Sequence, residues 1–516
     1  MKDRPTVLLL CLLALTTCAT PVLARPAEPP LALRIWEGAA PPILVVNTTD
    51  DIDDGACNAA HCSLREAINE ANEHAGPDTV WFTIPASDPG CDAEGVCTIA
   101  PTGSSFSLYD DGTTVDGYTQ HGAVPNTNPV GQPINAVLKI VLDGSLLPEC
   151  CPYGIHVWGS GSVIRGLVIQ GFHGGLDIID ASDNRIEGNF VGTDAHGLVA
   201  LGNRTSGILL TRTMGGPGSS NNWIGGSHPR TRNLISGNGR SGVGIVWGAS
   251  NRVQGNYIGT DASGAEPLPN RESGLHVEGE PGQHLIGGTG SGEANVIAFN
   301  DSEGVLIDGR YGNTVHNSIR RNSIHSNAGK GIWLWEGGNE GLPAPVIQYA
   351  SANMVTGTAC PSCTVEVFSD DQDEGAIYEG SVGANATGEW AFVDPDGLNG
   401  PNITATATDS SGNTSEFSQP YAMTGATPTA TATATRTASP TPTSTATLPQ
   451  PTYTPTLGPP TSTATLPQPT YTPTLGPPTH TATATPTTTP TPTATRGATP
   501  RAWRVMLPLV VRNLRA

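Results

Sequence analysis

The chain has 516 residues and a formal net charge of −21, with 25 Lys and Arg against 46 Asp and Glu. Lysine occurs only at positions 2, 139 and 330, so the chain lacks the basic surface that nucleic-acid binding requires. A single compact core rarely grows to this length, whereas a solenoid can, because it extends along one axis.

The N-terminal segment has the pattern of an export signal. Two basic residues precede an apolar run over Val7–Leu15, and a stretch of small residues ends at Ala24. We expect a secretory signal peptide over residues 1–24, with a lipoprotein signal ending before Cys18 as the alternative. Elsewhere no run of about 20 apolar residues occurs, so we expect no transmembrane segment after signal removal.

A short phrase recurs through the middle of the chain: a glycine followed by three mostly apolar residues. Its glycines are Gly154, Gly175, Gly207, Gly244, Gly274, Gly304 and Gly331. Asparagine-led turns stand between them, and one long phrase beginning at Asn184 is nearly duplicated from Asn251. The offset equals three repeats of about 22 residues, a period typical of solenoids. Short β-branched strands punctuated by Gly and Asn predict a parallel β-helix over residues 79–342.

The recurring asparagines have a predicted structural role. We expect Asn184, Asn251 and Asn313 to stack as a ladder whose side chains bond the backbone of neighbouring turns. This part of the chain resembles right-handed β-helix proteins, the fold of many polysaccharide lyases and epimerases. The resemblance implies an all-β, right-handed solenoid and a polysaccharide as substrate or ligand.

An amphipathic helix is predicted just before the solenoid. From Ser63 to His74 apolar residues recur on one helical face, with Ser63 as N-cap and Glu66 completing a capping box. The segment Cys62-Ser-Leu-Arg-Glu-Ala67 resembles the name-giving motif of the bacterial CSLREA domain, found at the front of secreted, repeat-built surface proteins. An open solenoid end exposes apolar core and strand edges, so we expect residues 45–78 to cap the first coil.

The composition changes after residue 342. Period-two runs in residues 343–424 predict a small β-sandwich, and the phrases CPSCTVEVFSD and ITATATDSSGNTSEFS resemble bacterial immunoglobulin-like modules. Residues 425–500 are almost all Thr, Pro, Ala and Ser, which predicts an extended stalk without a core. The apolar and basic residues 501–516 suggest a recognition tail, with a disordered end as the alternative.

The expected organisation therefore has seven parts. In chain order these are a signal peptide (1–24), a disordered leader (25–44), a CSLREA capping segment (45–78), a parallel β-helix (79–342), an immunoglobulin-like β-sandwich (343–424), a Thr/Pro-rich stalk (425–500) and a C-terminal tail (501–516).

Eight cysteines remain after signal removal, and they fall in close pairs: Cys57/Cys62, Cys91/Cys97, Cys150/Cys151 and Cys360/Cys363. Even number, local pairing and an export signal favour disulfides. Zinc is the alternative at Cys360-x-x-Cys363, but no second such pair stands nearby. Cys150 and Cys151 are adjacent, so each can pair with another cysteine instead.

Alternate residues of a strand point to opposite sides, so each glycine-led triplet predicts which side chains face solvent. The first outward column is expected to be His156, Asp177, Leu209, Val246, His276, Leu306 and Trp333. The column two residues further on is expected to be Trp158, Ile179, Thr211, Gly248, Glu278, Asp308 and Trp335.

One polar cluster follows from these columns. His276 and Glu278 lie one coil from Asp308, with Arg310 close in sequence. Two carboxylates about 5 Å apart can act as acid and nucleophile on a glycoside, and an arginine can stabilise a uronate. The alternative is a solvated polar face, which we favour because the acidic and Gly-His-Gly motifs of pectate-lyase-like and polygalacturonase-like enzymes are absent from the regular coils.

The outward aromatics Trp158, Trp333 and Trp335 are candidates for stacking on sugar rings. For the last two, which end the solenoid, packing beneath the following domain is the interpretation that we favour.

Acidic residues are concentrated in two loops. The first contains Asp50, Asp51, Asp53 and Asp54, and the second contains Asp370, Asp371 and Asp373. Calcium, a hard ion that takes several oxygen ligands, is the only cofactor that these loops suggest. The spacing is not that of an EF-hand, and a solvated acidic turn is the alternative.

The function predicted from the sequence is that of a secreted, extracellular β-helix protein. We expect a monomer that binds extracellular polysaccharide or the cell envelope, mediates adhesion without catalysis, and attaches to a surface through its C-terminal tail. The alternative is a polysaccharide lyase, hydrolase or epimerase that acts on the β-helix face.

Overall fold

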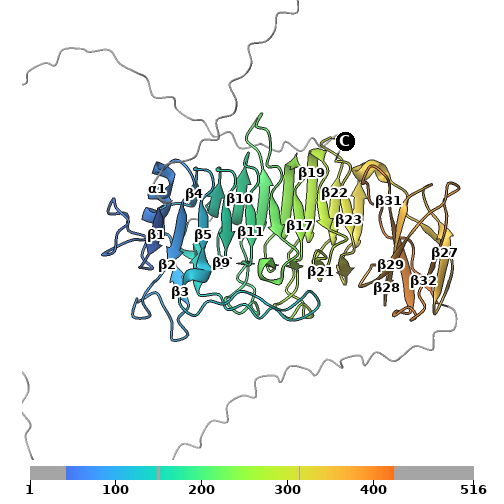
Figure 1. The fold of residues 1–516 in the computed structure, drawn as a ribbon, viewed down its shortest axis with the longest axis horizontal. Helices are drawn as coiled ribbons and strands as arrows, with labels where there is room; N and C mark the ends of the chain where they lie inside the picture. Colours follow the sequence, from blue (N-terminus) through green and yellow to red (C-terminus); the bar gives the residue numbers. More distant parts are fainter. Residues whose placement is uncertain (1–41, 148–151, 313, 424–516) are drawn as a thin grey trace, which may run out of the picture. The chain divides into compact units, whose positions relative to one another are not determined.

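The computed structural model describes residues 42–147, 152–312 and 314–423. The predicted signal peptide, most of the leader, the stalk, the tail, Cys150, Cys151 and Asn313 lie outside these residues. Strands stack side by side along the described chain, with the helix α1 beside the first of them (Figure 1). In the described ranges, no helix is both long enough and apolar enough to cross a membrane.

Three parallel sheets form the solenoid (Figure 1). Sheet 1 contains β1 (Ile43–Val46), β2 (Thr79–Phe82), β5 (Thr114–Asp116), β8 (Val163–Arg165), β11 (Arg185–Glu187), β14 (Trp223–Gly225), β17 (Arg252–Gln254), β20 (Leu285–Gly287) and β23 (Ser318–Arg320). Sheet 2 contains β4 (Phe106–Leu108), β7 (Tyr153–Val157), β10 (Gly174–Ile179), β13 (Ile208–Thr211), β16 (Val243–Ala249), β19 (Leu275–Gly282), β22 (Val305–Asp308) and β25 (Ile332–Trp335). Sheet 3 contains β3 (Cys97–Ile99), β6 (Ile140–Asp143), β9 (Leu167–Gln170), β12 (Phe190–Val191), β15 (Leu234–Ile235), β18 (Tyr257–Ile258), β21 (Val296–Ala298) and β24 (Ser323–His325).

From β2 onward each coil contributes one strand to each sheet, whereas β1 belongs to sheet 1 alone, and the strand register repeats from coil to coil. In sheet 2, for example, Ile155 pairs with Leu176, which pairs with Ile208. These three side chains point inward and are fully buried in one continuous core. The all-β parallel helix predicted from the glycine-led triplets is therefore confirmed. The pairing begins at β1, so Ile43 and Leu44 form strand rather than part of the leader.

Buried asparagines stack at the turns between the strands, as the sequence predicted for Asn184 and Asn251. The structure forms three such ladders rather than one. Their members are Asn184, Asn222, Asn251, His284, Asn317 and Asn339 in the first, Asn189, Asn233, Asn256, Asn295 and Asn322 in the second, and Asn203, Asn238, Asn270, Asn300 and Asn327 in the third.

The bonding of one rung explains why asparagine suits these turns. Asn233 receives the backbone N–H of Asn189 on its Oδ1 at 2.9 Å and donates Nδ2 to the carbonyl of Ile186 at 2.8 Å. It also bonds Asn256 Oδ1 in the next coil through both its backbone and its side-chain nitrogen. A buried turn has polar backbone groups without strand partners, and an amide side chain offers both a donor and an acceptor to them.

One predicted register is wrong. The glycine-led triplets predicted Gly244 as the coil glycine, but Gly242 occupies that place. A Cβ at Gly242 would meet the next coil's backbone and a ladder asparagine, as a Cβ at Gly207 or Gly274 would. Two glycines two residues apart satisfy the same strand pattern, so only the pairing decides between them. The outward columns therefore contain Gly244 and Val246 where the sequence placed Val246 and Gly248.

Both ends of the coil stack are covered. The helix α1 (Leu64–Glu73) has the predicted N-cap and capping box at Ser63 and Glu66, and its apolar face is buried in the coil core. At the other end, the side chain of Asn339 donates to the carbonyl of Thr414, and Asn327 donates to Glu374. Residues of the C-terminal sandwich thus terminate two of the ladders.

The sandwich has two antiparallel sheets, as the period-two pattern predicted. One contains β26 (Val346–Ser351), β27 (Met354–Thr358) and β30 (Glu389–Val393). The other contains β28 (Thr364–Asp370), β29 (Ile377–Gly383), β31 (Asn402–Thr408) and β32 (Tyr421–Ala422). Disulfides join Cys57 to Cys62, Cys91 to Cys97 and Cys360 to Cys363, which confirms three predicted pairs and leaves no thiolates for zinc at Cys360.

Truncating a central rung should lower stability strongly. Asn233→Ala leaves buried donors and acceptors on two coils without partners, so we expect the free energy of unfolding to fall by about 2–4 kcal/mol. Denaturant unfolding followed by circular dichroism measures the change. Asn69→Ala, on the exposed side of α1, is the matched control and should change stability by less than about 0.5 kcal/mol. Equal losses in both variants would contradict the ladder's role.

His284 makes the stability of the first ladder depend on pH. It is the one histidine among asparagines in the described ladders, and burial lowers its pKa to about 3. An unfolded histidine has a pKa near 6.5, so the unfolded chain gains protons first as pH falls. The stability from neutral His284 is therefore full above pH about 6.5 and is lost progressively toward pH 3. Between pH 7 and 5, the wild type should lose about 1–2 kcal/mol more than His284→Asn, measured by urea unfolding. Parallel curves would contradict this assignment.

Candidate functional site

The outer face of sheet 2 brings together the cluster that the sequence predicted. His276 and Glu278 lie on β19, and Glu278 is in register with Asp308 on β22. The imidazole Nε2 of His276 lies 3.5 Å from Asp308 Oδ2 and 3.8 Å from Glu278 Oε2. Arg310 reaches back over the end of β22, and its Nη2 donates to Asp308 Oδ2 at 2.7 Å. All four predicted residues are therefore neighbours.

The two carboxylates of this cluster have different electrostatic environments. Burial raises the pKa of Glu278, and the charge of His276 only partly opposes that shift. Burial also disfavours the Asp308 carboxylate, but hydrogen bonds from the side chain and backbone of Arg310 outweigh it and lower the pKa of Asp308. The structure thus holds one ionised, paired carboxylate beside one that protonates more readily.

The position of Asp308 limits what the cluster can do chemically. Its side chain is fully buried, and both carboxylate oxygens accept hydrogen bonds from Arg310. A nucleophile needs a free lone pair that can reach the substrate, and Asp308 does not offer one. The ligand atoms of His276, Glu278 and Asp308 lie within 4.8 Å of one another, as a metal site requires. The guanidinium of Arg310 already neutralises Asp308, however, so this donor set fits a cation poorly.

Aromatic side chains lie next to the cluster. The guanidinium carbon of Arg310 lies 3.7 Å from the ring centroid of Trp335, and Trp335 stacks on Trp333 with centroids 5.3 Å apart. Both indoles are half-buried and lie on the outer side of the last strand, and Trp335 is the one in contact with the arginine. Trp158, at the other end of sheet 2, is 37% exposed and stacks with Tyr109.

Sequence reasoning missed a second polar group on the same sheet. His156 on β7 and Asp177 on β10 are in register, and His156 Nδ1 lies 3.6 Å from Asp177 Oδ2. Their places in adjacent repeats already indicated this contact. The third member of their row, Ser107 on β4, comes from the irregular first coils, where no glycine-led triplet defines the register.

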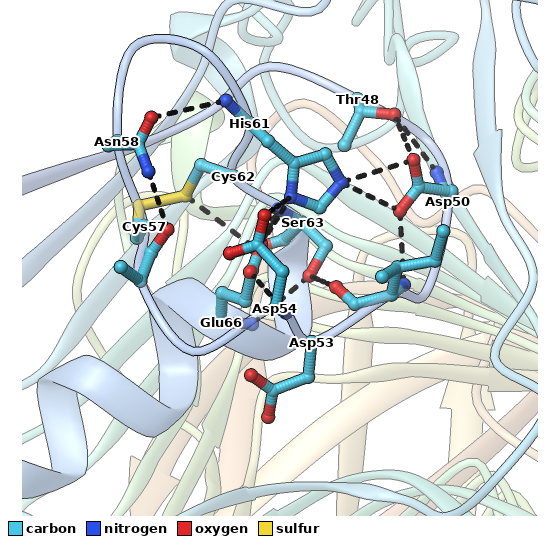
Figure 2. A network of polar contacts seen from close by, with 12 residues as sticks. Thr48, Asp50, Asp53, Asp54, Cys57, Asn58, His61, Cys62, Ser63 and Glu66 are labelled. Carbon is cyan, nitrogen blue, oxygen red and sulfur yellow. Dashed lines mark hydrogen bonds and ion pairs between the residues drawn. A yellow bond between two sulfur atoms is a disulfide. The ribbon is translucent and has the colours of Figure 1, made fainter.

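The predicted calcium loop lies in the N-terminal cap, where its acidic residues have internal partners (Figure 2). Asp50 lies 3.2 Å from His61 Nε2, and Asp54 lies 3.6 Å from His61 Nδ1. Asp51 instead pairs with Arg65, and Asp53 accepts hydrogen bonds from residues of its own loop and of α1. The four aspartates therefore do not converge on one point.

His61 is the centre of this network. Its Nδ1 lies 3.0 Å from Glu66 Oε2, in addition to the contacts with Asp50 and Asp54 (Figure 2). Burial disfavours the charged ring, but the three carboxylates outweigh that effect and raise the pKa of His61. The imidazole of His61 thus occupies the position among these carboxylates that a cation would take. Asp54, His61 and Glu66 could also ligate a metal by distance, in competition with protonation of the ring.

The residues of the Cys62–Ala67 motif have structural roles in the cap. Cys62 forms the disulfide with Cys57, Ser63 caps the helix, and Leu64 and Ala67 are fully buried. Arg65 pairs with Asp51 and lies over the ring of Phe106. Glu66 accepts the backbone N–H groups of Ser63 and Asp54, each at 2.8 Å.

The second acidic loop lies between β28 and β29. Asp370 accepts the backbone N–H groups of Gln372 and Ala376, and burial raises its pKa to about 6. Asp371 and Asp373 are exposed. These contacts organise the turn within the loop itself.

Comparisons with known proteins give one family match. Residues 153–342 match the family model described as the right handed beta helix region. Similar solved structures include Geobacillus virus E2 ORF18, with 14% identity, a TM-score of 0.31 and coverage of 71% of this chain and 76% of that chain. The A-module of mannuronan C-5 epimerase AlgE4 from Azotobacter vinelandii has 16% identity, a TM-score of 0.28 and coverage of 55% and 73%. Alginate lyase from Paenibacillus sp. has 15% identity, a TM-score of 0.24 and coverage of 56% and 98%. No curated protein matches the sequence.

Glu66 should be essential for the stability of the cap. Glu66→Gln replaces one acceptor oxygen by an amide donor that faces a backbone N–H, so we expect a loss of about 1–3 kcal/mol. The exposed Glu73→Gln, on the same helix, is the control and should be near neutral. Denaturant unfolding of the two variants measures the difference. A Glu66 variant as stable as the control would contradict the assigned role.

Proposed function

We propose that the protein binds extracellular carbohydrate on the outer face of sheet 2, without cleaving glycosidic bonds there. The observation that carries this proposal is the group formed by Trp333, Trp335 and Arg310 beside Glu278 and His276. Indole faces stack on sugar rings, and half-buried charged groups exchange hydrogen bonds with sugar hydroxyls.

The burial and pairing of Asp308 support binding rather than hydrolysis. A retaining glycosidase needs two reachable carboxyl groups, and only Glu278 of the two is partly exposed, at 19% of its side chain. The acidic net charge also repels a strongly anionic ligand, except where an arginine lies close to it. We therefore expect neutral or weakly acidic glycans to bind best.

The wider context of this proposal follows the sequence. We propose an exported, extracellular protein in which a CSLREA-type cap and an immunoglobulin-like module flank the coils and a Thr/Pro-rich stalk and C-terminal tail attach them to a surface. The disulfide pairs support an oxidising compartment. In this arrangement the glycan-binding face serves adhesion to a polysaccharide or a neighbouring cell envelope.

Glycan binding can be tested directly on the purified full-length chain. A glycan array followed by calorimetry should find a bound glycan, and Trp335→Ala should weaken its affinity about tenfold or more. Trp81→Ala is the control, because Trp81 is a surface tryptophan, 38% exposed, that lies on sheet 1. No bound glycan, or equal loss in both variants, would contradict the proposal.

The alternative is an enzyme that cleaves or epimerises polysaccharide at the same cluster. The different pKa shifts of Glu278 and Asp308 favour it, because separated pKa values are typical of acid–base pairs. Incubation with uronate-containing and neutral glycans distinguishes the two functions. New unsaturated or reducing ends that disappear in Glu278→Gln would establish the enzyme and overturn the binding-only function.

A further inference from the structure

Three polar side chains stand in one row across the first strands of sheet 2. Ser107 on β4 is in register with His156 on β7, and His156 is in register with Asp177 on β10. All three side chains point outward, because the residues on either side of them in each strand belong to the coil core. Adjacent parallel strands are about 4.8 Å apart, so the row places a hydroxyl, an imidazole and a carboxyl next to one another.

The carboxyl and the imidazole form a buried pair. Asp177 is only 6% exposed, and its Oδ1 has no hydrogen-bond partner, although it is buried. Its Oδ2 lies 3.6 Å from His156 Nδ1, which is also buried and otherwise without a partner, while 22% of the His156 side chain remains exposed. The pair thus sets a carboxyl beside Nδ1, the place that an orienting carboxylate takes next to a general base.

The imidazole of His156 lies between the other two members of the row, because β7 pairs with β10 on one side and with β4 on the other. Its Nδ1 faces Asp177 on β10, so Nε2 is the nitrogen that remains to take a proton from Ser107. Asn72 of α1 fixes this part of β4, because its side chain bonds the carbonyl of Ser107 and the N–H of Tyr109. Contacts between nucleophile and base are often loose without substrate, so register and orientation are the informative features.

We propose that Ser107, His156 and Asp177 form a catalytic triad that hydrolyses carboxylic esters carried on carbohydrate. The order serine, base, orienting carboxyl along one row is the relation that defines such triads on unrelated folds. Tyr109 and Trp158 directly follow β4 and β7, two residues after Ser107 and His156, and their rings stack on each other. They offer a sugar ring a stacking surface beside the hydroxyl. This choice of substrate rests on the proposed carbohydrate binding, whereas the ester chemistry does not.

The reaction is an acyl transfer in two steps. Ser107 Oγ forms a bond to the acyl carbon, and its proton passes to His156 Nε2. The ester C–O bond then breaks, and the departing sugar oxygen takes that proton. Water attacks the acyl-serine, again giving its proton to His156, and the carboxylic acid leaves as the Ser107 hydroxyl is restored.

Covalent labelling tests the nucleophile independently of any glycan. A fluorophosphonate probe should label the full-length chain at Ser107, located by peptide mass spectrometry, and the protein should release acetate from p-nitrophenyl acetate. Ser107→Ala should abolish labelling and lower hydrolysis at least about 100-fold. Ser105→Ala, two residues before Ser107 in the same segment, is the matched control and should retain both labelling and ester hydrolysis. Thermal unfolding of each variant establishes that the fold is kept.

The role of Asp177 has a separate readout. Asp177→Asn should lower kcat about 100-fold or more with little change in KM, because Asp177 positions His156 and does not touch the substrate. A natively folded chain that neither reacts with the probe nor hydrolyses the ester, or one labelled equally in Ser107→Ala, overturns the triad. Ester hydrolysis without preference for acetylated sugars over acetylated alcohols overturns only the carbohydrate assignment, and loss of glycan binding alone leaves the triad standing.

Discussion

The structure depends on satisfying the backbone of buried turns. A strand in a coil bonds the strands of the coils before and after it, whereas the turns between sheets lie outside these regular ladders and leave part of their polar backbone without a strand partner. Asparagine supplies the missing donor and acceptor, and its Oδ1 and Nδ2 link each turn to the same turn one coil away. Because every rung is bonded through its neighbours, the coil spacing and the strand register are fixed together.

A fixed register turns the outer strand faces into ordered rows of side chains. Glu278 stands beside Asp308, and His156 beside Asp177, only because their strands pair without a shift at those positions. A shift of one residue would send each of these side chains into the core. The polar groups of sheet 2 are therefore consequences of the same rungs that hold the core together.

The ends of the stack place a different demand on the chain. The first and last coils expose apolar core and strand edges, and each end of the described coils is covered by polar as well as apolar groups. At the N-terminal end, Glu66 and Arg65 connect α1 to the acidic loop around His61. At the C-terminal end, Glu366 is fully buried and pairs with Arg320 on β23, the last strand of sheet 1. The acidic residues near both ends thus serve the closure of the stack.

The sequence by itself determined the solenoid, the capping helix at Ser63 and the sandwich, because each depends on a local period or a local cap. It also predicted that Glu278 and Asp308 would be neighbours, since both stand at the same place in regular repeats. Only the tertiary structure decided between Gly242 and Gly244, because both fit the strand pattern and the choice rests on contacts with the next coil. The row from Ser107 to Asp177 was likewise decided there, because irregular first coils have no period from which a register can be inferred.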